Sequence, residues 1–225
     1  MTEILRLDDV SLSLPSRAGL VEILKKVSFT AEVGEAIGII GPSGSGKTSM
    51  LMVASGLEAV SGGKVAACGF SFDGQSEQAL ARFRRDNIGI VFQSFHLIPT
   101  MTAIENVAVP LEFRGASDAN EQAAEALRKV GLGHRLTHYP SQLSGGEQQR
   151  VAIARAIAAG AKILLADEPT GNLDQETGAA VIELLFEMKE KTGATLLLVT
   201  HDRALAQRCD RILEVRDGHV TEGRA

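Results

Sequence analysis

The stretch Ala36-Ile37-Gly38-Ile39-Ile40-Gly41-Pro42-Ser43-Gly44-Ser45-Gly46-Lys47-Thr48 decides the fold. Its first five residues are nearly all apolar, which is typical of a strand buried on both faces. A glycine-rich loop follows, and we expect a helix from about Thr48 to Glu58 after it. The glycines let successive backbone N–H groups turn inward, toward phosphate oxygens, without a Cβ clash. The stretch therefore predicts a phosphate-binding loop (P-loop) in an α/β fold.

Each residue of this loop has an expected role toward a nucleotide. Lys47 should reach the β- and γ-phosphates, and the Thr48 hydroxyl should bind Mg²⁺. The N-terminus of the following helix adds partial positive charge. The residues expected to line the phosphates are Gly41, Pro42, Ser43, Gly44, Ser45, Gly46, Lys47 and Thr48.

Two further apolar runs resemble buried strands and end in polar residues. The run 163–166 is followed by Asp167 and Glu168, and the run 195–199 precedes His201. Asp167 would hold Mg²⁺, and Glu168 could accept a proton from the water that attacks the γ-phosphate. Taken without the P-loop, the two acids could equally be a solvated pair at a strand end. Three buried strands with helices between them predict a parallel sheet with its functional loops at the carboxyl edge.

The remaining patterns predict the surrounding elements. Alternating apolar residues over 10–14 and 27–33 predict half-exposed antiparallel strands. The segment from about 75 to 159 is mostly helical, with a capping box at Asp118–Glu121 and a break or kink at Pro110. The C-terminal runs 211–215 and 219–221 predict a hairpin with a tight Asp217-Gly218 turn.

Composition restricts the class of protein. The chain has 225 residues, of which 44% are hydrophobic, so it can bury a core. A net charge of −5 argues against a nucleic-acid binder. The two cysteines, Cys68 and Cys209, indicate reduced thiols without a metal or catalytic role. We expect no membrane-spanning helix and no signal peptide, so any membrane role must come through a partner.

The run Leu143-Ser144-Gly145-Gly146-Glu147-Gln148-Gln149-Arg150 opens a long helix. Ser144 there is either a plain N-cap or a ligand of an anion at the helix start, and one hydroxyl can serve both roles in turn. This run is one of six motifs whose order along the chain is that of ATP-binding subunits of ABC transporters. The other motifs are the P-loop, Gln93, the acid pair, the run Gly171-Asn172-Leu173-Asp174 and His201. The chain resembles this family over essentially its whole length.

The resemblance implies a fold, which would be an α/β P-loop NTPase with a mixed or parallel sheet core, an antiparallel β subdomain and a helical subdomain. A single ABC ATPase domain would span 1–225. Residues 1–75 and 160–225 would form the catalytic core with the β subdomain, and about 76–159 the Q-loop region and the helical signature subdomain.

The resemblance also implies the cofactors, ATP and Mg²⁺, and the remaining roles. Ser144, Gly145 and Gly146 would contact the γ-phosphate held by the P-loop of a second copy of the chain. Gln93, after the strand 88–92, would touch Mg²⁺ and the attacking water. Asp174 would lie near the partner's P-loop, and His201 would bond the γ-phosphate and orient Glu168.

Shorter sequence patterns indicate a subgroup within the ABC transporter family. The run Val91–Phe95, the run Ala166–Asp174 and Thr200-His201-Asp202 are similar to the subunits of lipoprotein-releasing and macrolide-efflux systems. Other runs, such as Leu97–Thr100, are closest to YbbA-type subunits. The resemblance therefore implies an ATPase homodimer, bound through a permease at the cytoplasmic face of the inner (plasma) membrane. It would power export or extraction of a lipid, a lipoprotein or a similar hydrophobic molecule.

Some readings stay open. The alternative function is a non-transport ABC-type ATPase, acting as a regulatory or nucleic-acid-associated module, although the long coiled coil of the chromosome proteins is missing. The apolar run Phe95–Met101 is either ordinary packing or a groove for a coupling helix of the permease. No aromatic residue that could stack on adenine lies upstream of Val27, so Leu14 or Val21 would have to pack against the base. The basic residues Arg82, Arg84 and Arg85 indicate a solvated face.

Overall fold

The computed structural model describes residues 2–16 and 19–223 and divides into two compact units. The first unit comprises Met1–Arg84 and Thr195–Ala225, and the second comprises Arg85–Ala194. Among the described residues, no helix is both long and apolar enough to cross a membrane.

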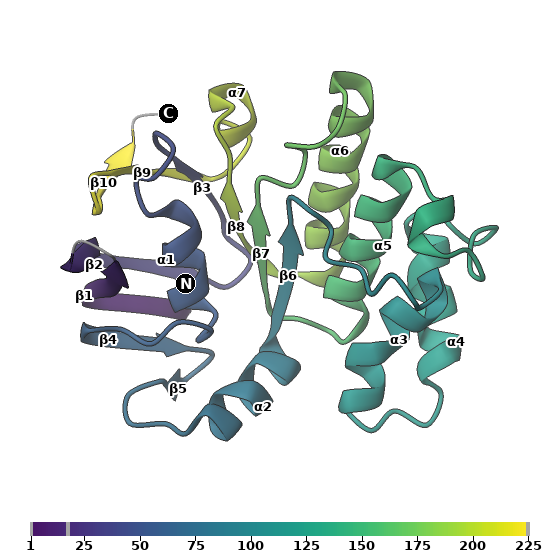
Figure 1. Ribbon diagram of the computed structural model, residues 1–225, viewed down its shortest axis with the longest axis horizontal. Coiled ribbons are helices and arrows are strands. Elements are labelled where there is room, and N and C mark those ends of the chain that lie inside the picture. Colours follow the sequence, from purple (N-terminus) through teal and green to yellow (C-terminus); the bar gives the residue numbers. More distant parts are fainter. Residues whose placement is uncertain (1, 17–18, 224–225) are drawn as a thin grey trace. The chain divides into compact units, whose positions relative to one another are not determined.

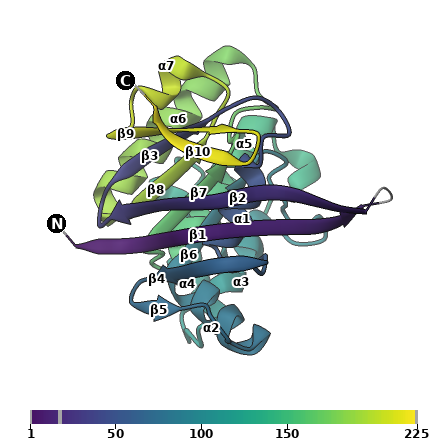
Figure 2. The ribbon, with the colours of Figure 1, turned by 90° about the vertical axis from the view of Figure 1, so that its left-hand side faces the viewer.

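The first unit contains an antiparallel sheet in the order β2-β1-β4-β5. Its strands are β1 (Glu3–Ser16), β2 (Gly19–Glu32), β4 (Gly62–Ala67) and β5 (Phe70–Ser71). Figure 2 shows β1 and β2 as a long hairpin lying side by side. In β2 the alternate residues Val27, Phe29 and Ala31 are buried, whereas Ser28 and Thr30 between them are exposed, and in β1 Val10 and Leu12 are buried on either side of the half-buried Ser11. The prediction of half-exposed antiparallel strands is confirmed.

The same unit holds strands in the order β10-β9-β3-β8. The strands are β3 (Ala36–Ile40), β8 (Thr195–Val199), β9 (Arg211–Arg216) and β10 (His219–Gly223). Strand β3 pairs in parallel with both β8 and β9, and every residue of β3 and β8 is buried. Because both faces are covered, the continuous apolar runs of the sequence are explained. The predicted hairpin is β9–β10, and Asp217 and Gly218 both take positive φ in its turn.

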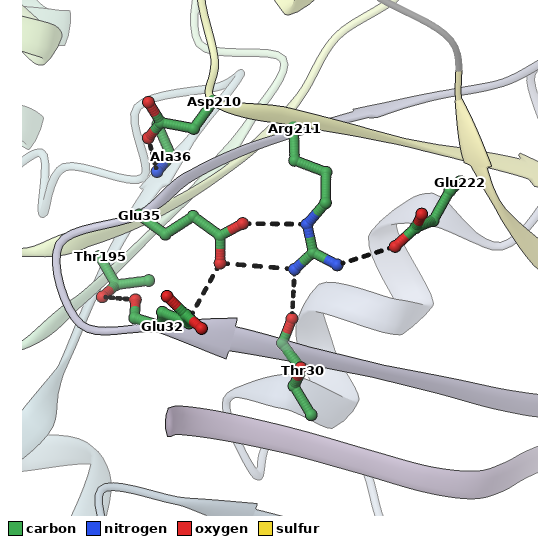
Figure 3. A network of polar contacts seen from close by, with 8 residues as sticks. All are labelled: Thr30, Glu32, Glu35, Ala36, Thr195, Asp210, Arg211 and Glu222. Atoms are coloured by element: carbon green, nitrogen blue, oxygen red, sulfur yellow. Dashed lines mark hydrogen bonds and ion pairs between the residues drawn. The ribbon is translucent and has the colours of Figure 1, made fainter. Parts of the chain in front are cut away.

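A polar network joins the end of β2 to β3 and β9 within this unit (Figure 3). Arg211 Nε donates to Glu35 Oε1 at 2.9 Å, and Arg211 Nη1 lies 3.3 Å from Glu222 Oε1. The same guanidinium donates to the carbonyl oxygen of Thr30. The hydroxyl oxygen of Thr195 accepts a hydrogen bond from Gly34 N, also at 2.9 Å. These bonds fix the start of β3, and therefore the loop at its other end.

In the described part of this unit the helices are α1 (Lys47–Ala54), α7 (Arg203–Ala206) and most of α2 (Glu77–Asn87), whose last residues belong to the second unit. Helix α1 ends earlier than predicted, at Ala54 rather than near Glu58. Ser55 caps it, and Gly56 then adopts φ 71°, a conformation in which the helix cannot continue and which glycine tolerates best.

The second unit packs helices against the parallel strands β6 (Ile88–Phe92) and β7 (Ile163–Asp167). Its helices are α3 (Ala103–Phe113), α4 (Ala119–Lys129), the 3₁₀ helix η1 (Pro140–Gln142), α5 (Gly145–Ala158) and α6 (Gln175–Thr192). Helix α5 contacts α3, α4, α6 and β6, and Figure 1 shows α3, α4 and α5 gathered together. A Cβ on Gly89 would lie 2.3 Å from the carbonyl oxygen of Ala156, so α5 approaches β6 closely only because that residue is glycine. The prediction of a mostly helical segment is confirmed.

Two local predictions in this unit differ from the structure. Helix α3 runs through Pro110, so the predicted break does not occur, whereas the kink stays a prediction; buried residues from Ala103 to Leu111 lie on both sides of the proline. Asp118 forms no capping box at the start of α4. Its carboxylate accepts a hydrogen bond from Gln122 Nε2 at 2.7 Å, so the backbone N–H groups of the first turn do not use it.

Candidate functional site

The loop between β3 and α1 has the geometry of a phosphate cradle. Lys47 Nζ donates to the carbonyl oxygens of Gly41 and Pro42, each at 2.9 Å, so the side chain folds back over the loop. A Cβ on Gly41 would lie 2.1 Å from the carbonyl oxygen of Val215, which leaves room only for glycine there. Helix α1 begins at Lys47, and its N-cap residue, Gly46, has no side chain that could cap the free N–H groups of the first turn, which suits an anion at this helix start.

Polar groups inside the loop fit a phosphate ligand. Ser45 Oγ is buried and has no hydrogen-bond partner, and Lys47 is 7% exposed. The buried Ser45 hydroxyl and the buried Lys47 ammonium group lie beside N–H donors that no side chain caps. Such a set of donors suits a bound polyanion better than packing against other protein groups. The loop residues expected from the sequence are therefore brought together around one cradle.

His201 leaves the first unit's parallel strands at the same edge as the P-loop. Residues Ile39 of β3 and Val199 of β8 are in register, and Thr200 N donates to the carbonyl oxygen of Ile39 at 3.1 Å. Gly41 and His201 each lie two residues beyond that register pair. The His201 side chain is exposed.

The acid pair ends β7 in the second unit. Asp167 is the last residue of the strand, and Glu168 follows with φ 44°, in the left-handed region. A glutamate in this region costs about 1–3 kcal/mol of backbone strain, which proteins store mainly at functional sites. The carbonyl oxygen of Glu168 accepts from Gly171 N at 3.0 Å, so a tight turn holds the strained residue.

Gln93 lies beside this turn. Phe92 of β6 pairs with Asp167 of β7, so Gln93 and Glu168 both leave the sheet immediately after a register pair. Gln93 Nε2 donates to Asn172 Oδ1 at 3.3 Å, and Asn172 Nδ2 donates to the carbonyl oxygen of Gln93 at 3.0 Å. A Cβ on Gly171 would lie 2.6 Å from Gln93 Nε2. The structure thus brings together Gln93, the acid pair and the start of the Gly171–Asp174 run.

The start of α5 is a capped and exposed helix N-terminus. Ser144 Oγ accepts from Glu147 N at 3.3 Å, and Glu147 Oε2 accepts from Ser144 N at 2.8 Å. The bond from the Ser144 N–H lowers the pKa of Glu147, and burial opposes this effect only in part. Arg135 Nε adds a bond to Glu147 Oε1 at 2.8 Å. Ser144 therefore serves as the N-cap in this structure while its side chain faces solvent.

Small residues let α5 approach α6 at this point. A Cβ on Gly146 would lie 2.3 Å from Thr177 Cγ2, and a Cβ on Gly145 would lie 3.1 Å from Leu173 Cδ2. Asp174 is the N-cap of α6, and its carboxylate accepts from Thr177 N at 3.0 Å. Hydrogen bonds from Thr177 lower the pKa of Asp174.

Sequence patterns did not indicate the roles of two side chains of α5, the buried Gln149 and the half-buried Arg155. Gln149 Nε2 donates to the carbonyl oxygen of Pro169 at 2.6 Å. Arg155 donates to the carbonyl oxygens of Phe95 and His96, and burial lowers the pKa of its guanidinium. A helical period could have indicated Gln149, because it is a polar residue in the buried stripe that contains Gly146, Ile153 and Ala156. No comparable signal marks Arg155.

These elements define a class: a P-loop nucleotide hydrolase with an acid pair at a strand end and a glycine-containing signature helix. The model of the family "ABC transporter" matches residues 24–171. The uncharacterized ABC transporter ATP-binding protein YbbA of Escherichia coli K12 is 47% identical over 204 residues, which cover 90% of each chain. The lipoprotein-releasing system ATP-binding protein LolD 2 of Caulobacter vibrioides is 47% identical over 207 residues, or 91% of each.

A solved structure agrees with these relatives. The dimeric structure of a post-hydrolysis state of the ATP-binding cassette MJ0796, bound to ADP and Pi, superposes with a TM-score of 0.90 at 38% identity, covering 98% of both chains. The chain belongs to the ABC transporter family. It has the ABC ATPase fold and is an ATP-binding and ATP-hydrolysing transporter subunit, as its sequence predicts.

Proposed function

We propose that two copies of this chain enclose two ATP molecules and drive a membrane permease. The observation that carries the proposal is the start of α5, where Ser144 is exposed although most of the helix is buried. An exposed helix N-terminus with a serine hydroxyl is a site for an anion, and a second copy would supply that anion as the γ-phosphate on its P-loop. The dimeric state named for the MJ0796 cassette supports this arrangement.

Each residue then has a role in hydrolysis. The P-loop holds the phosphates, and Thr48, Asp167 and Gln93 are the oxygen donors that would hold Mg²⁺. The metal would offset the negative charge of the β- and γ-phosphates. Water attacks the γ-phosphorus and its proton passes to Glu168, while the bond from that phosphorus to the oxygen of the β-phosphate breaks.

Other residues orient the γ-phosphate and the base. His201 bonds the γ-phosphate and orients Glu168. Asp174 lies at the boundary with the second copy, near its P-loop.

Adenine is held without an aromatic ring. Leu14 and Val21 are cross-strand partners in the β1–β2 hairpin, and Val21 is 44% exposed. We assign the base to this aliphatic pair, which forgoes the roughly 0.5–1.5 kcal/mol that stacking on an aromatic side chain can add.

The permease contact falls on the loop Phe95–Met101. Ile98 is 37% exposed there, and buried Asn106 donates to the carbonyl oxygens of Ile98 and Met101 at 3.1 and 3.0 Å. A fixed loop with an exposed apolar side chain suits a short helix of a membrane partner. Through it the ATPase would sit at the cytoplasmic face of the inner membrane and power export or extraction of a lipid, lipoprotein or similar molecule.

Mixing two inactive variants tests the shared sites. Lys47→Ala removes the P-loop ammonium, and Ser144→Glu places a like charge where the partner's γ-phosphate would bind. In a mixed dimer, the Ser144→Glu chain contributes an intact P-loop and the Lys47→Ala chain contributes an intact signature helix. Together these two parts form one complete ATP site. We expect each variant alone to be inactive and the mixture to gain measurable activity. Half of the dimers mix and each has one good site, so the ceiling is about a quarter of the wild-type rate for independent sites, and coupling between the two sites lowers the rate below that ceiling. A mixture no more active than its components would overturn the proposal.

A further inference from the structure

Gln149 is a fully buried polar side chain whose amide serves two separate segments of backbone. It has 0% exposure and lies on α5 five residues after Ser144. Its Nε2 donates to the carbonyl oxygen of Pro169 at 2.6 Å and lies 3.4 Å from the carbonyl oxygen of Phe92. A single amide nitrogen therefore joins α5 to the ends of two strands.

The two carbonyl groups flank the residues expected to act on the γ-phosphate. Phe92 directly precedes Gln93, and Pro169 directly follows Glu168. The Glu168 backbone is already in the left-handed region at φ 44°. A shift of the Pro169 carbonyl therefore changes where the Glu168 carboxylate points, and a shift of the Phe92 carbonyl does the same for the Gln93 amide.

The amide is retained at a cost to stability. Gln149 Oε1 is buried and has no hydrogen-bond partner. The surrounding stripe of α5 is apolar or small, with Gly146 and Ile153 on the same face. An apolar side chain of similar length would avoid the unsatisfied oxygen. Packing alone does not explain a glutamine here, whereas the two backbone contacts do.

A displacement of the start of α5 would be passed along the helix to Gln149. The Cβ position of Gly146 lies 2.3 Å from Thr177 Cγ2, so the first turn of α5 is in tight contact with the first turn of α6. Helical hydrogen bonds then connect that turn to Gln149 through one more turn. The start of α5 and the Gln149 side chain that binds the Pro169 carbonyl oxygen therefore lie less than two turns apart on one continuous helix.

We propose that Gln149 is a positioning residue that couples the two ATP sites of the dimer. This inference rests on the proposed homodimer. There, Ser144 serves the nucleotide bound by the other copy, whereas Glu168 and Gln93 serve the nucleotide on the chain's own P-loop. Gln149 connects these two sets within one chain. Engagement of the partner's ATP at Ser144 thus sets Glu168 and Gln93 for hydrolysis at the chain's own site.

The ATP dependence of hydrolysis by the purified full chain tests the coupling. Gln149→Met keeps the length of the side chain and removes the N–H donor. We expect mant-ATP affinity within about twofold of wild type, kcat lower by about tenfold, and a Hill coefficient that falls toward 1 from a wild-type value with a ceiling of about 2 for two sites. The matched control Gln122→Met, at an exposed position of α4, should leave all three quantities unchanged. Wild-type kcat and Hill coefficient in Gln149→Met would overturn the inference.

A pH series separates positioning from simple destabilisation. In Gln149→Glu, a buried carboxyl keeps its proton to higher pH than usual and can then donate to Pro169 through its O–H. Once ionised, it repels both carbonyl oxygens. We expect kcat of Gln149→Glu relative to wild type to rise at least about threefold from pH 8 to pH 6, whereas the ratio for Gln149→Met stays flat. Equal, pH-independent losses in the two variants would contradict a hydrogen-bonding role. If Gln149→Met folds poorly, a pH-independent loss in Gln149→Glu, measured against wild type, contradicts that role by itself.

Failure of the coupling is distinguishable from failure of the dimer. A double variant, Gln149→Met with Glu168→Gln, should still form a dimer with ATP and Mg²⁺, because Gln149 touches no nucleotide. If Glu168→Gln alone stays monomeric, the proposed function fails. If both proteins dimerise while Gln149→Met hydrolyses ATP like wild type, the inference about Gln149 alone fails.

Discussion

Arg155 Nη1 donates a hydrogen bond of 2.6 Å to the carbonyl oxygen of His96. His96 and the preceding Phe95 both have positive φ, at 47° and 61°, and Nη2 of the same guanidinium binds the Phe95 carbonyl oxygen at 2.9 Å. A helix side chain thus holds a strained pair directly after Gln93 and Ser94. The backbone of the proposed permease loop is therefore held from α5 at Phe95 and His96, whereas Asn106 of α3 holds it at Ile98 and Met101.

Replacement of Arg155 by Met should release this loop. We expect a loss of about 1–3 kcal/mol in unfolding free energy, since two carbonyl groups lose a charged donor. Amide hydrogen exchange should speed up over residues 94–98. The control Arg128→Met removes only the exposed pair with Glu125 and should change stability by less than about 0.5 kcal/mol. Unchanged exchange in the loop would contradict this role for Arg155.

Gly146→Ala should destabilise the start of α5, although alanine is the better helix former. The added Cβ would lie 2.3 Å from Thr177 Cγ2. We expect a cost of about 1–3 kcal/mol from the clash. Thr177→Ser removes that methyl group, so the double variant should recover most of the loss. Denaturant unfolding of the two single variants and the double variant gives the coupling, and strictly additive effects would argue against the contact.

The Arg211 network should contribute to the stability of the first unit. Arg211 is about a quarter exposed and binds Glu35, Glu222 and the Thr30 carbonyl oxygen, whereas Arg216 is 72% exposed and binds Glu214. Arg211→Met should therefore lower the free energy of unfolding by about 1–3 kcal/mol, and Arg216→Met by less than about 0.5 kcal/mol. Thermal unfolding of both variants, compared with wild type, measures the difference. Equal losses would show that the network adds no more than a surface pair.

The capping box of α5 predicts an acid response. Hydrogen bonds from Ser144 and Arg135 lower the pKa of Glu147 in the folded state below the ordinary value of 4.5. A lowered folded-state pKa stabilises the protein above 4.5, and this contribution is lost as pH falls below that value. Glu147→Gln should be less stable than wild type at pH 7, and the difference should shrink as the pH falls below 4.5. A difference that stays constant over this range would contradict the assignment.

Sequence patterns predicted the bounds of strands and turns best where a single local cause determines the structure. Buried strands β3 and β8 begin and end where the apolar runs 36–40 and 195–199 do, because both faces of each strand are covered. The Asp217-Gly218 turn follows from the same kind of local rule. The P-loop could be predicted for a similar reason. Its glycines are required by close backbone contacts, such as the contact of Gly41 with the carbonyl oxygen of Val215.

Local rules failed where a competing contact decides. Asp118 has the residue type of a helix cap, yet its carboxylate accepts a hydrogen bond from the side chain of Gln122, in the next turn of the same helix. Pro110 lies within α3 because apolar contacts on both sides outweigh the missing N–H. Gln149 and Arg155 act on carbonyl groups 20 and about 60 residues away, and such partners leave no mark at short sequence separation.

The central claim is that ATP joins two copies of this chain, and the most direct test is the mass of Glu168→Gln in solution by light scattering. With ATP and Mg²⁺ the account predicts twice the monomer mass, and with ADP the monomer mass, because only the γ-phosphate engages Ser144 of the second copy. Glu168→Gln that binds ATP yet keeps the monomer mass at concentrations well above its ATP dissociation constant would contradict the account.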